Sequence, residues 1–294
     1  MKRNFWMKMR SPLLAVFILA GCDQSDPLSS NDNSPMATED AAESIASAVG
    51  SDNGGAMDQL SDLAELASVA GIQGQEGGAL GKLDETADID TTYDPGTGTW
   101  TAVISRERGN PNGVPYASFS RTYTYQFLNK DGQPQKYWRV RNGAQIDTAY
   151  TIKLNIVAGT GTHRTRRLSQ QLTGLSGAFT ATGTNTALIT INGTYSRSAV
   201  DTVTTRNAVR TLDHTLSLNL IDVKIPRGNR GNFSRQISGT ITGNYTATAT
   251  FQSGSLYEER NLNRDFTITL GGGDVRIKIR GLNFIGDLLR GELR

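Results

Sequence analysis

The stretch from Ile237 to Phe251, ISGTITGNYTATATF, decides the fold class of this chain. Its large apolar residues stand at even intervals, at Ile237, Ile241, Tyr245 and Phe251. Successive side chains of a β-strand point to opposite faces, so residues at even intervals share one face. The stretch therefore predicts a long strand with one apolar face and one polar, threonine-rich face.

The same period of two begins near Tyr93 and continues toward the end of the chain. It places three further sets on shared faces: Tyr123, Tyr125 and Phe127; Ile152, Leu154 and Ile156; and Leu216, Leu218 and Leu220. After Leu220 the parity changes to Ile221, Val223 and Ile225, which predicts a β-bulge. The three glycines 271–273 predict a hairpin that sets Phe266, Ile268 and Leu270 against Val275, Ile277 and Ile279.

A short motif occurs twice, as Ile191-Asn-Gly-Thr-Tyr195 and fifty residues later as Ile241-Thr-Gly-Asn-Tyr245. Asn192-Gly193 alone would indicate a turn, but Gly243 stands inside a continuous alternation. We therefore expect both glycines inside strands, where a glycine often marks a bend or a close approach of backbones. An aromatic side chain of a neighbouring strand is expected to pack over each of them.

The pattern indicates roughly ten to twelve strands joined by hairpin-like turns, without helices between them. Such a pattern favours an antiparallel arrangement over βαβ units. Long antiparallel strands twist and coil, and a sheet of many strands tends to close or to roll up. The predicted fold class is mainly β: a large antiparallel meander, forming a strongly curved or barrel-like sheet, with two short N-terminal helices.

Two weakly amphipathic segments with helical spacing precede the strands. In the first, Thr38 is the expected N-cap, and Ala41, Ile45 and Val49 share a face. The second follows Gly54-Gly55, ends near Gly71, and has a face made of Leu60, Leu63, Ala64 and Ala67. We expect a signal peptide at 1–21, a disordered tether at 22–37, an acidic helical segment and connector at 38–90, and a β-domain at 91–294 that folds by itself.

The first 22 residues resemble the signal sequence of bacterial lipoproteins. Basic residues precede the apolar run 13–20, which is too short to span a bilayer. Leu19-Ala-Gly-Cys22 is similar to the lipobox of that family, and Cys22 is the only cysteine. The resemblance implies cleavage before Cys22, a palmitate-type lipid anchor on its sulfur, and a place in the cell envelope. Asp23 and Gln24 fit retention at the inner membrane as well as export to the surface, so the membrane stays open.

The charges are unevenly divided along the chain. Residues 22–90 hold fifteen Asp or Glu and one Lys, whereas residues 91–294 hold 25 Lys or Arg and 13 Asp or Glu. This asymmetry predicts that the acidic helices dock on the basic β-domain of the same chain. Exposed ion pairs contribute only about 0–1 kcal/mol each, so burial of Ile45, Val49, Leu60 and Leu63 is expected to hold the helices.

No catalytic or cofactor motif stands in the sequence, and we expect no catalytic residue, no cofactor and no metal. There is no nucleophile elbow, no zinc-binding helix motif and no phosphate-binding glycine loop. Asp213 and His214 are adjacent, so in a strand they point to opposite faces. His163 is expected in a solvated basic loop. One acidic cluster carries groups that could bind calcium: Asp84, Glu85, Asp88, Asp90 and Asp94. It lacks the EF-hand spacing, which favours a solvated connector over a calcium site.

Arginine side chains are the better candidates for a binding site. Arg164, Arg166 and Arg167 form one cluster, and Arg227 and Arg230 form a second in the loop PRGNRGN. Guanidinium groups pair with carboxylate, phosphate or sulfate through two parallel hydrogen bonds, which makes both clusters candidate anion sites. Solvated sheet faces are the alternative. Aromatic residues gather between 93 and 150, and we expect most of them in the core rather than stacked on sugars.

We therefore expect a lipid-anchored envelope protein that binds or scaffolds an anionic, glycan or protein partner and catalyses no reaction. Nucleic acid is not expected as a partner, because the lipoprotein resemblance implies a location outside the cytoplasm. Two alternatives stay open. One is a carrier or chaperone for a hydrophobic ligand inside a curved sheet, with the helices as a lid. The other is a glycan hydrolase that uses two carboxylates from distant strands.

Overall fold

The computed structural model describes residues 35–52, 54–67, 88–204, 209–227 and 236–294. The predicted lipobox with Cys22 lies outside these ranges, as do Arg230, Asp84 and Glu85. Two helices come first, α1 at Pro35–Val49 and α2 at Ala56–Leu66. The strands are β1 Asp88–Asp94, β2 Thr99–Gly109, β3 Tyr116–Leu128, β4 Pro134–Gln135, β5 Arg139–Asn142, β6 Gln145–Thr148, β7 Thr151–Arg164, β8 Leu168–Thr182, β9 Leu188–Thr204, β10 Val209–Pro226, β11 Ser238–Ser253, β12 Leu256–Gly271, β13 Asp274–Ile279 and β14 Leu282–Asp287.

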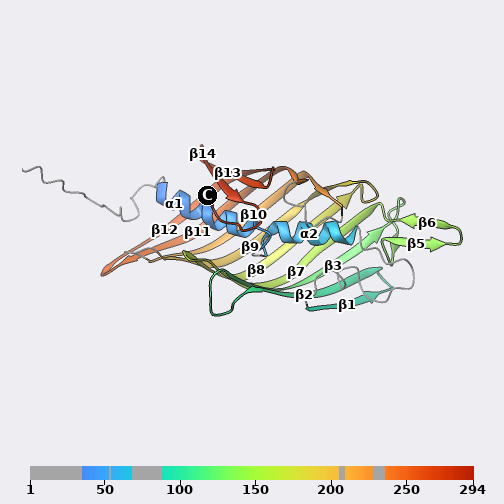
Figure 1. The fold of residues 1–294 in the computed structure, drawn as a ribbon, viewed down its shortest axis with the longest axis horizontal. Coiled ribbons are helices and arrows are strands. Elements are labelled where there is room, and N and C mark those ends of the chain that lie inside the picture. The colour runs from blue at the N-terminus through green and yellow to red at the C-terminus, as the bar shows by residue number, and fades with distance from the viewer. Residues whose placement is uncertain (1–34, 53, 68–87, 205–208, 228–235) are drawn as a thin grey trace, which may run out of the picture.

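Twelve strands form one antiparallel sheet, with α1 and α2 lying along one of its faces (Figure 1). The strand order is β1-β2-β3-β7-β8-β9-β10-β11-β12-β13-β14, with β4 beside β3. Among the described strands, β5 and β6 lie outside this sheet and form a separate two-stranded ribbon. The mainly β class, the large antiparallel meander and the two N-terminal helices are thus confirmed.

The sheet is neither closed nor strongly curled, so the expected strongly curved or barrel-like form is wrong. In the described part of the chain, β1 and β14 are the two edges and do not pair with each other. The helices cover the apolar face, and a covered face does not need closure to leave water. The edges are protected in other ways. Edge strand β1 carries exposed carboxylates at Asp88, Asp90 and Asp94. At β14, the Asp287 amide donates to the Glu292 carbonyl of the C-terminal tail at 2.9 Å.

The predicted bulge and hairpin are both present. β10 shifts its register against β9 between Leu220 and Val223, and Asp222 takes a positive φ of 52°. Across the glycine hairpin, β12 pairs with β13 as expected: Phe266 with Ile279, Ile268 with Ile277, and Leu270 with Val275. Both predictions are confirmed because each depends on a local change in spacing.

The two motif glycines lie inside strands, Gly193 in β9 and Gly243 in β11. A Cβ added at either position would come within 3.0 Å of a phenylalanine ring, Phe179 at the first and Phe266 at the second. Both phenylalanines come from the neighbouring strand. The expectation of an aromatic side chain packed over each glycine is therefore confirmed.

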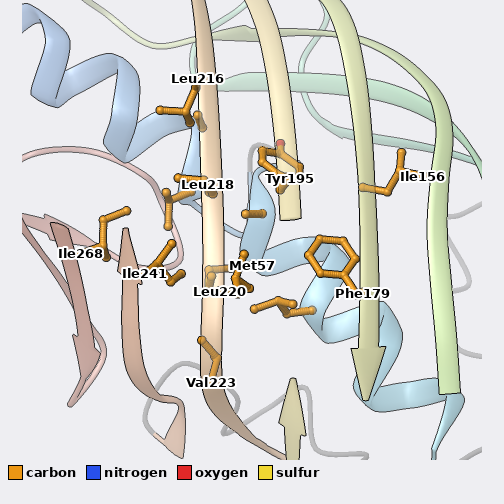
Figure 2. Packing of buried hydrophobic residues seen from close by; sticks show 14 of the residues in the cluster. Met57, Ile156, Phe179, Tyr195, Leu216, Leu218, Leu220, Val223, Ile241 and Ile268 are labelled. Carbon is orange, nitrogen blue, oxygen red and sulfur yellow. The ribbon is translucent and has the colours of Figure 1, made fainter. Parts of the chain in front are cut away.

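The helices differ slightly from expectation and share the core of the sheet. α1 begins at Pro35, so Thr38 lies within the helix and is not its N-cap. Proline suits the first helical position because the N–H that it lacks has no helical partner there. The apolar stripe expected to hold the helices is fully buried in one cluster with the inward side chains of the sheet: Ile45, Val49, Leu60 and Leu63. Figure 2 shows Met57 of α2 among side chains of β10 and β11.

Candidate binding site

The acidic helix α2 meets basic residues of the sheet through buried ion pairs. Arg106 on β2 lies 3.2 Å from Asp58 and 2.6 Å from Asp62. Arg121 on β3 lies 2.6 Å from Asp58, and the Tyr123 hydroxyl donates to Asp62 at 3.0 Å. The four charged side chains are at most 3% exposed. The predicted docking of the acidic helices on the basic sheet is confirmed for these residues.

The turn between the helices positions α2 against Arg121. Gly54 has a φ of 71°, and its carbonyl accepts a hydrogen bond from the Arg121 guanidinium. A side chain at Gly54 would collide with Arg121 and Phe119. Burial raises the pKa of Asp58, but Arg106 and Arg121 outweigh burial and leave that pKa below its ordinary value. Asp58 is therefore ionised in the folded protein at neutral pH.

Helix α1 makes a second set of buried polar contacts. Asp40 lies 2.9 Å from Arg210 Nε on β10. Burial raises the pKa of Asp40 to about 6, although Arg210 pulls it down. Ser44 donates to Asp201 of β9, whose carboxylate also lies 3.0 Å from His214 Nε2. Helix α1 is thus attached to the sheet by polar side chains as well as by apolar packing.

His163 is buried rather than solvated, which corrects the sequence-based expectation. It lies within β7, is 5% exposed, and has its Nδ1 3.1 Å from Ser47 Oγ of α1. The ladders of β3 and β8 continue through it, so no loop forms there. Burial, with Arg197 nearby, lowers the pKa of His163 to about 4. The imidazole is therefore neutral at physiological pH.

These contacts do not form an accessible nucleophilic site. Ser44 donates to Asp201 rather than to a histidine, and Ser47 beside His163 is fully buried. Asp213 is exposed while His214 is buried, so the prediction that they point to opposite faces is confirmed. Catalytic triads need a nucleophile that the substrate can reach. The polar groups of this interface attach the helices to the sheet instead.

The opposite, solvent-facing side of the sheet holds a groove of about 1060 Å³ that crosses strands β8 to β13. Its floor follows one line of residues paired across the strands: Gly177, Tyr195, Leu218, Gly243 and Phe266. The larger side chains of this line are buried on the helix side. Since side chains alternate along a strand, the residues before and after each of them point outward and form the walls.

The walls are two rows made mainly of small polar side chains. One row runs through Ser176, Ser196, Ser217, Asn244 and Asp265. The other runs through Ala178, Thr194, Asn219, Thr242, Thr267 and Lys278. Arg280 lines the groove just after β13, and the Asn244 amide donates to Asp265 at 2.8 Å. Hydroxyls and amides both donate and accept hydrogen bonds, so the rows offer both functions along their length.

The sequence does not single out the groove residues, because each is an ordinary outward residue of its strand. The available signal is the run of Thr, Ser and Asn at alternate positions of β8 to β12. That signal gives the face of each side chain and not its height along the strand. Only the register of five strand pairs aligns the residues into rows.

Arg227 and the first predicted arginine cluster lie at opposite ends of β7 to β10, while Arg230 lies outside the described residues. Arg164 ends β7 and is followed by Arg166 and Arg167, whereas Arg227 follows the far end of β10. Arg164 donates to the Pro111 carbonyl and Arg167 lies 3.8 Å from Glu43 of α1, so two of these three charges have partners in the chain. The structure does not bring Arg227 to the cluster of Arg164, Arg166 and Arg167. Anion binding at either of them stays a prediction.

The other sequence candidates are mostly structural. Several aromatic residues of the 93–150 region are buried, as expected: Trp100, Phe119, Tyr123, Tyr125, Phe127 and Trp138. Asp88 and Asp90 are exposed on β1, and Asp94 accepts hydrogen bonds from Gly96 N and Thr97 Oγ1. Among the residues that the structure describes, no three His, Cys, Asp or Glu side chains are grouped to hold a metal ion.

The groove and the helix–sheet interface differ in access. The interface is buried, while the groove is open to solvent along the outer face. Neither described helix is long and apolar enough to cross a membrane. Comparison of the chain with known protein families, with curated proteins and with solved structures finds no match.

Proposed function

We propose that this protein is a lipid-anchored protein of the cell envelope that binds an extended glycan in its outer groove and does not transform it. The supporting observation is the pair of mainly polar rows, one crossing five strands and the other six. Neighbouring strands lie about 4.8 Å apart, so the groove is roughly 24 Å long. This length suits several linked sugar rings rather than one. The lipid on Cys22, implied by the lipobox resemblance, would hold the groove near the membrane.

The chemistry of the walls matches a glycan better than the other polymers considered. Sugar hydroxyls donate and accept hydrogen bonds, as the Ser, Thr and Asn side chains of the groove do. Nucleic acids are bound chiefly by cations along the whole path of the backbone, whereas Lys278 and Arg280 lie together at one end. Hydrolysis of glycans usually needs two carboxylates, and Asp265 is the sole carboxylate among the groove-lining residues. Binding is therefore favoured over hydrolysis.

Blocking the groove tests the proposal. In the full chain carrying Cys22→Ser, we would introduce Ser196→Trp and Asn219→Trp, whose indoles would fill the groove. The matched control is Thr250→Trp, which places the same side chain on the same face of β11 outside the groove. We expect retention on immobilised envelope polysaccharides to weaken about tenfold or more in the groove variants and to stay unchanged in the control. Equal retention by all forms would contradict glycan binding in the groove.

The lipid anchor is tested separately. Cys22→Ser should abolish labelling by palmitate analogues and leave a precursor that is either uncleaved or released from membranes. The reason is that Cys22 is the only thiol available for acylation. Unchanged membrane fractionation of the variant would contradict the anchor and would leave the groove proposal untouched.

A carrier of hydrophobic ligands is the second candidate, favoured by the buried charges under the helices. Burying a charge is costly, so a helix held partly by ion pairs separates from the sheet more readily than one held by apolar contacts alone. Displaced helices would open an apolar face to a ligand.

A disulfide between α1 and β14 tests the carrier. A Cβ at Gly286 would lie 3.5 Å from Ala46 Cβ, which suits a disulfide between Ala46→Cys and Gly286→Cys. A carrier should lose fatty-acid binding when this bond forms in the Cys22→Ser chain and regain it on reduction. Equal fatty-acid binding with and without the disulfide would exclude the lid mechanism.

A further inference from the structure

Two guanidinium groups meet one indole ring at the end of the sheet next to the β5–β6 ribbon. The Arg139 guanidinium carbon lies 4.5 Å from the centre of the Trp138 ring, and that of Arg227 lies 5.4 Å from the same centre. Arg139 begins β5, while Arg227 directly follows β10, almost ninety residues later in the chain. Thr184 lies between them in sequence and accepts from Arg227 at 3.5 Å.

Neither arginine has a carboxylate partner in the part of the chain that the structure describes. Among the described residues no carboxylate lies within ion-pair distance of Arg139 or Arg227, in contrast to Arg106, Arg121 and Arg210, which all have Asp partners. The Nε of Arg139 is buried without a hydrogen-bond acceptor, and so is the indole N–H of Trp138. Trp138 is 3% exposed. Buried donors without acceptors are uncommon in folded proteins and call for an explanation.

The electrostatics point to an anionic ligand. A guanidinium over an aromatic ring gains about 0.5–2 kcal/mol. Two like charges beside one ring repel each other, and the repulsion grows where water is partly excluded. An oxyanion bound by both guanidinium groups would offset that repulsion and supply acceptors for the unpaired N–H groups of Arg139 and Trp138. Planar guanidinium forks suit phosphate oxygens in particular.

We propose that Arg139 and Arg227, together with the Trp138 indole that both approach, form a binding site for the phosphate group of a phosphorylated ligand. The site is separate from the groove, whose lining residues include neither arginine. The surroundings favour an anion, because Arg141 lies on the same ribbon. Nearby Asp147 already accepts a hydrogen bond from Asn142 at 2.9 Å. One of the two predicted arginine clusters thus contributes Arg227 to a site, with a partner that the sequence does not indicate.

Tryptophan fluorescence of the full Cys22→Ser chain provides the measurement, because Trp138 is part of the site. Inorganic phosphate, a sugar phosphate and vesicles containing phosphatidic acid would be titrated in parallel, with phosphatidylcholine vesicles as the blank. We expect a saturable change in emission with at least one phosphate probe. Arg139→Gln and Arg227→Gln should each weaken binding of that probe about tenfold or more, because each removes one fork. The probe that binds most tightly identifies the source of the phosphate as free, sugar-linked or lipid-linked.

Matched controls separate the site from general charge and from folding. Arg141→Gln removes a charge from the same ribbon but not from the indole, and should change affinity by less than about twofold. Arg227→Lys keeps the charge and loses the fork, so it should bind more weakly than wild type while melting at the same temperature. Ser196→Trp in the groove should leave phosphate binding unchanged, which keeps this test independent of glycan binding. If no probe binds, or if the two Gln variants bind as tightly as wild type, the phosphate site is wrong.

Discussion

The two faces of one strand show how differently this sheet treats polar residues. On the helix side of β9, Arg197 and Asp201 are buried under α1 and bonded to side chains. On the other side, Thr194 and Ser196 of the same strand line an open groove. The inner face accepts charge only where an opposite charge or a hydrogen bond meets it, because an unpaired buried charge is expensive. The outer face needs no such partners and can offer its polar groups to a ligand.

This comparison has an energetic side. Removing one partner of a buried ion pair leaves the other charge buried without a partner, which lowers the free energy of unfolding by several kcal/mol. Replacing an exposed polar side chain changes that free energy little. The inner face is therefore where stability resides, and the outer face is where changes can alter binding without unfolding the protein. Four changes test this division, from the largest expected effect to the smallest.

Removing both helices is the most severe test. Residues 91–294 alone would expose the apolar inner face and leave Arg106, Arg121 and Arg210 without their carboxylate partners. We expect this fragment to lose its cooperative thermal transition and to bind hydrophobic dyes, as partly packed states do. A cooperative melt close to that of the full chain would instead support the sequence-based domain boundary at residue 91, which stays a prediction.

The second test compares one carboxylate on each face. Asp58→Ala should lower the free energy of unfolding by about 3–5 kcal/mol, because Arg106 and Arg121 both lose a buried partner. Asp265→Ala on the outer face should change it by no more than about 0.5 kcal/mol. Urea unfolding of the two variants measures both values. Similar losses in the two variants would mean that the faces are not distinct in this respect.

The third test concerns space on the inner face. Gly243→Ala should destabilise the protein by about 1–3 kcal/mol, because the new methyl group would collide with Phe266. Gly174→Ala on β8 is the control, since its Cβ would meet nothing nearer than Ser198 Cβ at 3.6 Å. The control should be neutral or slightly stabilising, because alanine restricts the unfolded chain. A neutral Gly243→Ala would show that Phe266 moves aside without cost.

The smallest effect is a pH dependence that His163 should produce. Its pKa is about 4 in the folded protein, lowered by burial and by Arg197, against about 6.5 in the unfolded chain. The folded state therefore binds fewer protons, so stability is full above pH 6.5 and falls as the pH drops toward 4. At pH 5.5 the loss is on the order of 1 kcal/mol. His163→Gln should remove this part of the dependence in melting curves.

The same measurement carries an internal check. Asp40 has its pKa raised to about 6, mainly by burial, so its protonation as the pH falls from 6 toward 4 stabilises the folded state. This change opposes the effect of His163 over much of the same range. The difference between His163→Gln and wild type isolates the histidine, because Asp40 is common to both. Parallel curves for the two proteins would exclude a protonation change at His163.

Much of the fold is determined by the sequence alone. The alternation of apolar residues locates the strands, the parity change after Leu220 locates the bulge, and Gly271 to Gly273 locate a hairpin with its correct pairing. The division of charge correctly predicts that the acidic helices dock on the basic sheet. These features depend on spacing within a few residues or on totals over long segments, and both can be read without knowing the register of distant strands.

Only the tertiary structure decided which polar groups meet and what shape the sheet takes. Ser44 and Asp201 are hydrogen-bonded although they are 157 residues apart. The guanidinium groups of Arg139 and Arg227 both approach the ring of Trp138, which lies in the β4–β5 connection. The open edges, the burial of His163 and the alignment of the groove rows depend likewise on register summed over many strand pairs and on where the helices lie. A one-residue change of register in any pair would leave the sequence pattern intact and would move every side chain beyond it to the opposite face. Local patterns therefore fix the elements of this protein, while its candidate binding sites exist only because distant strands meet in one register.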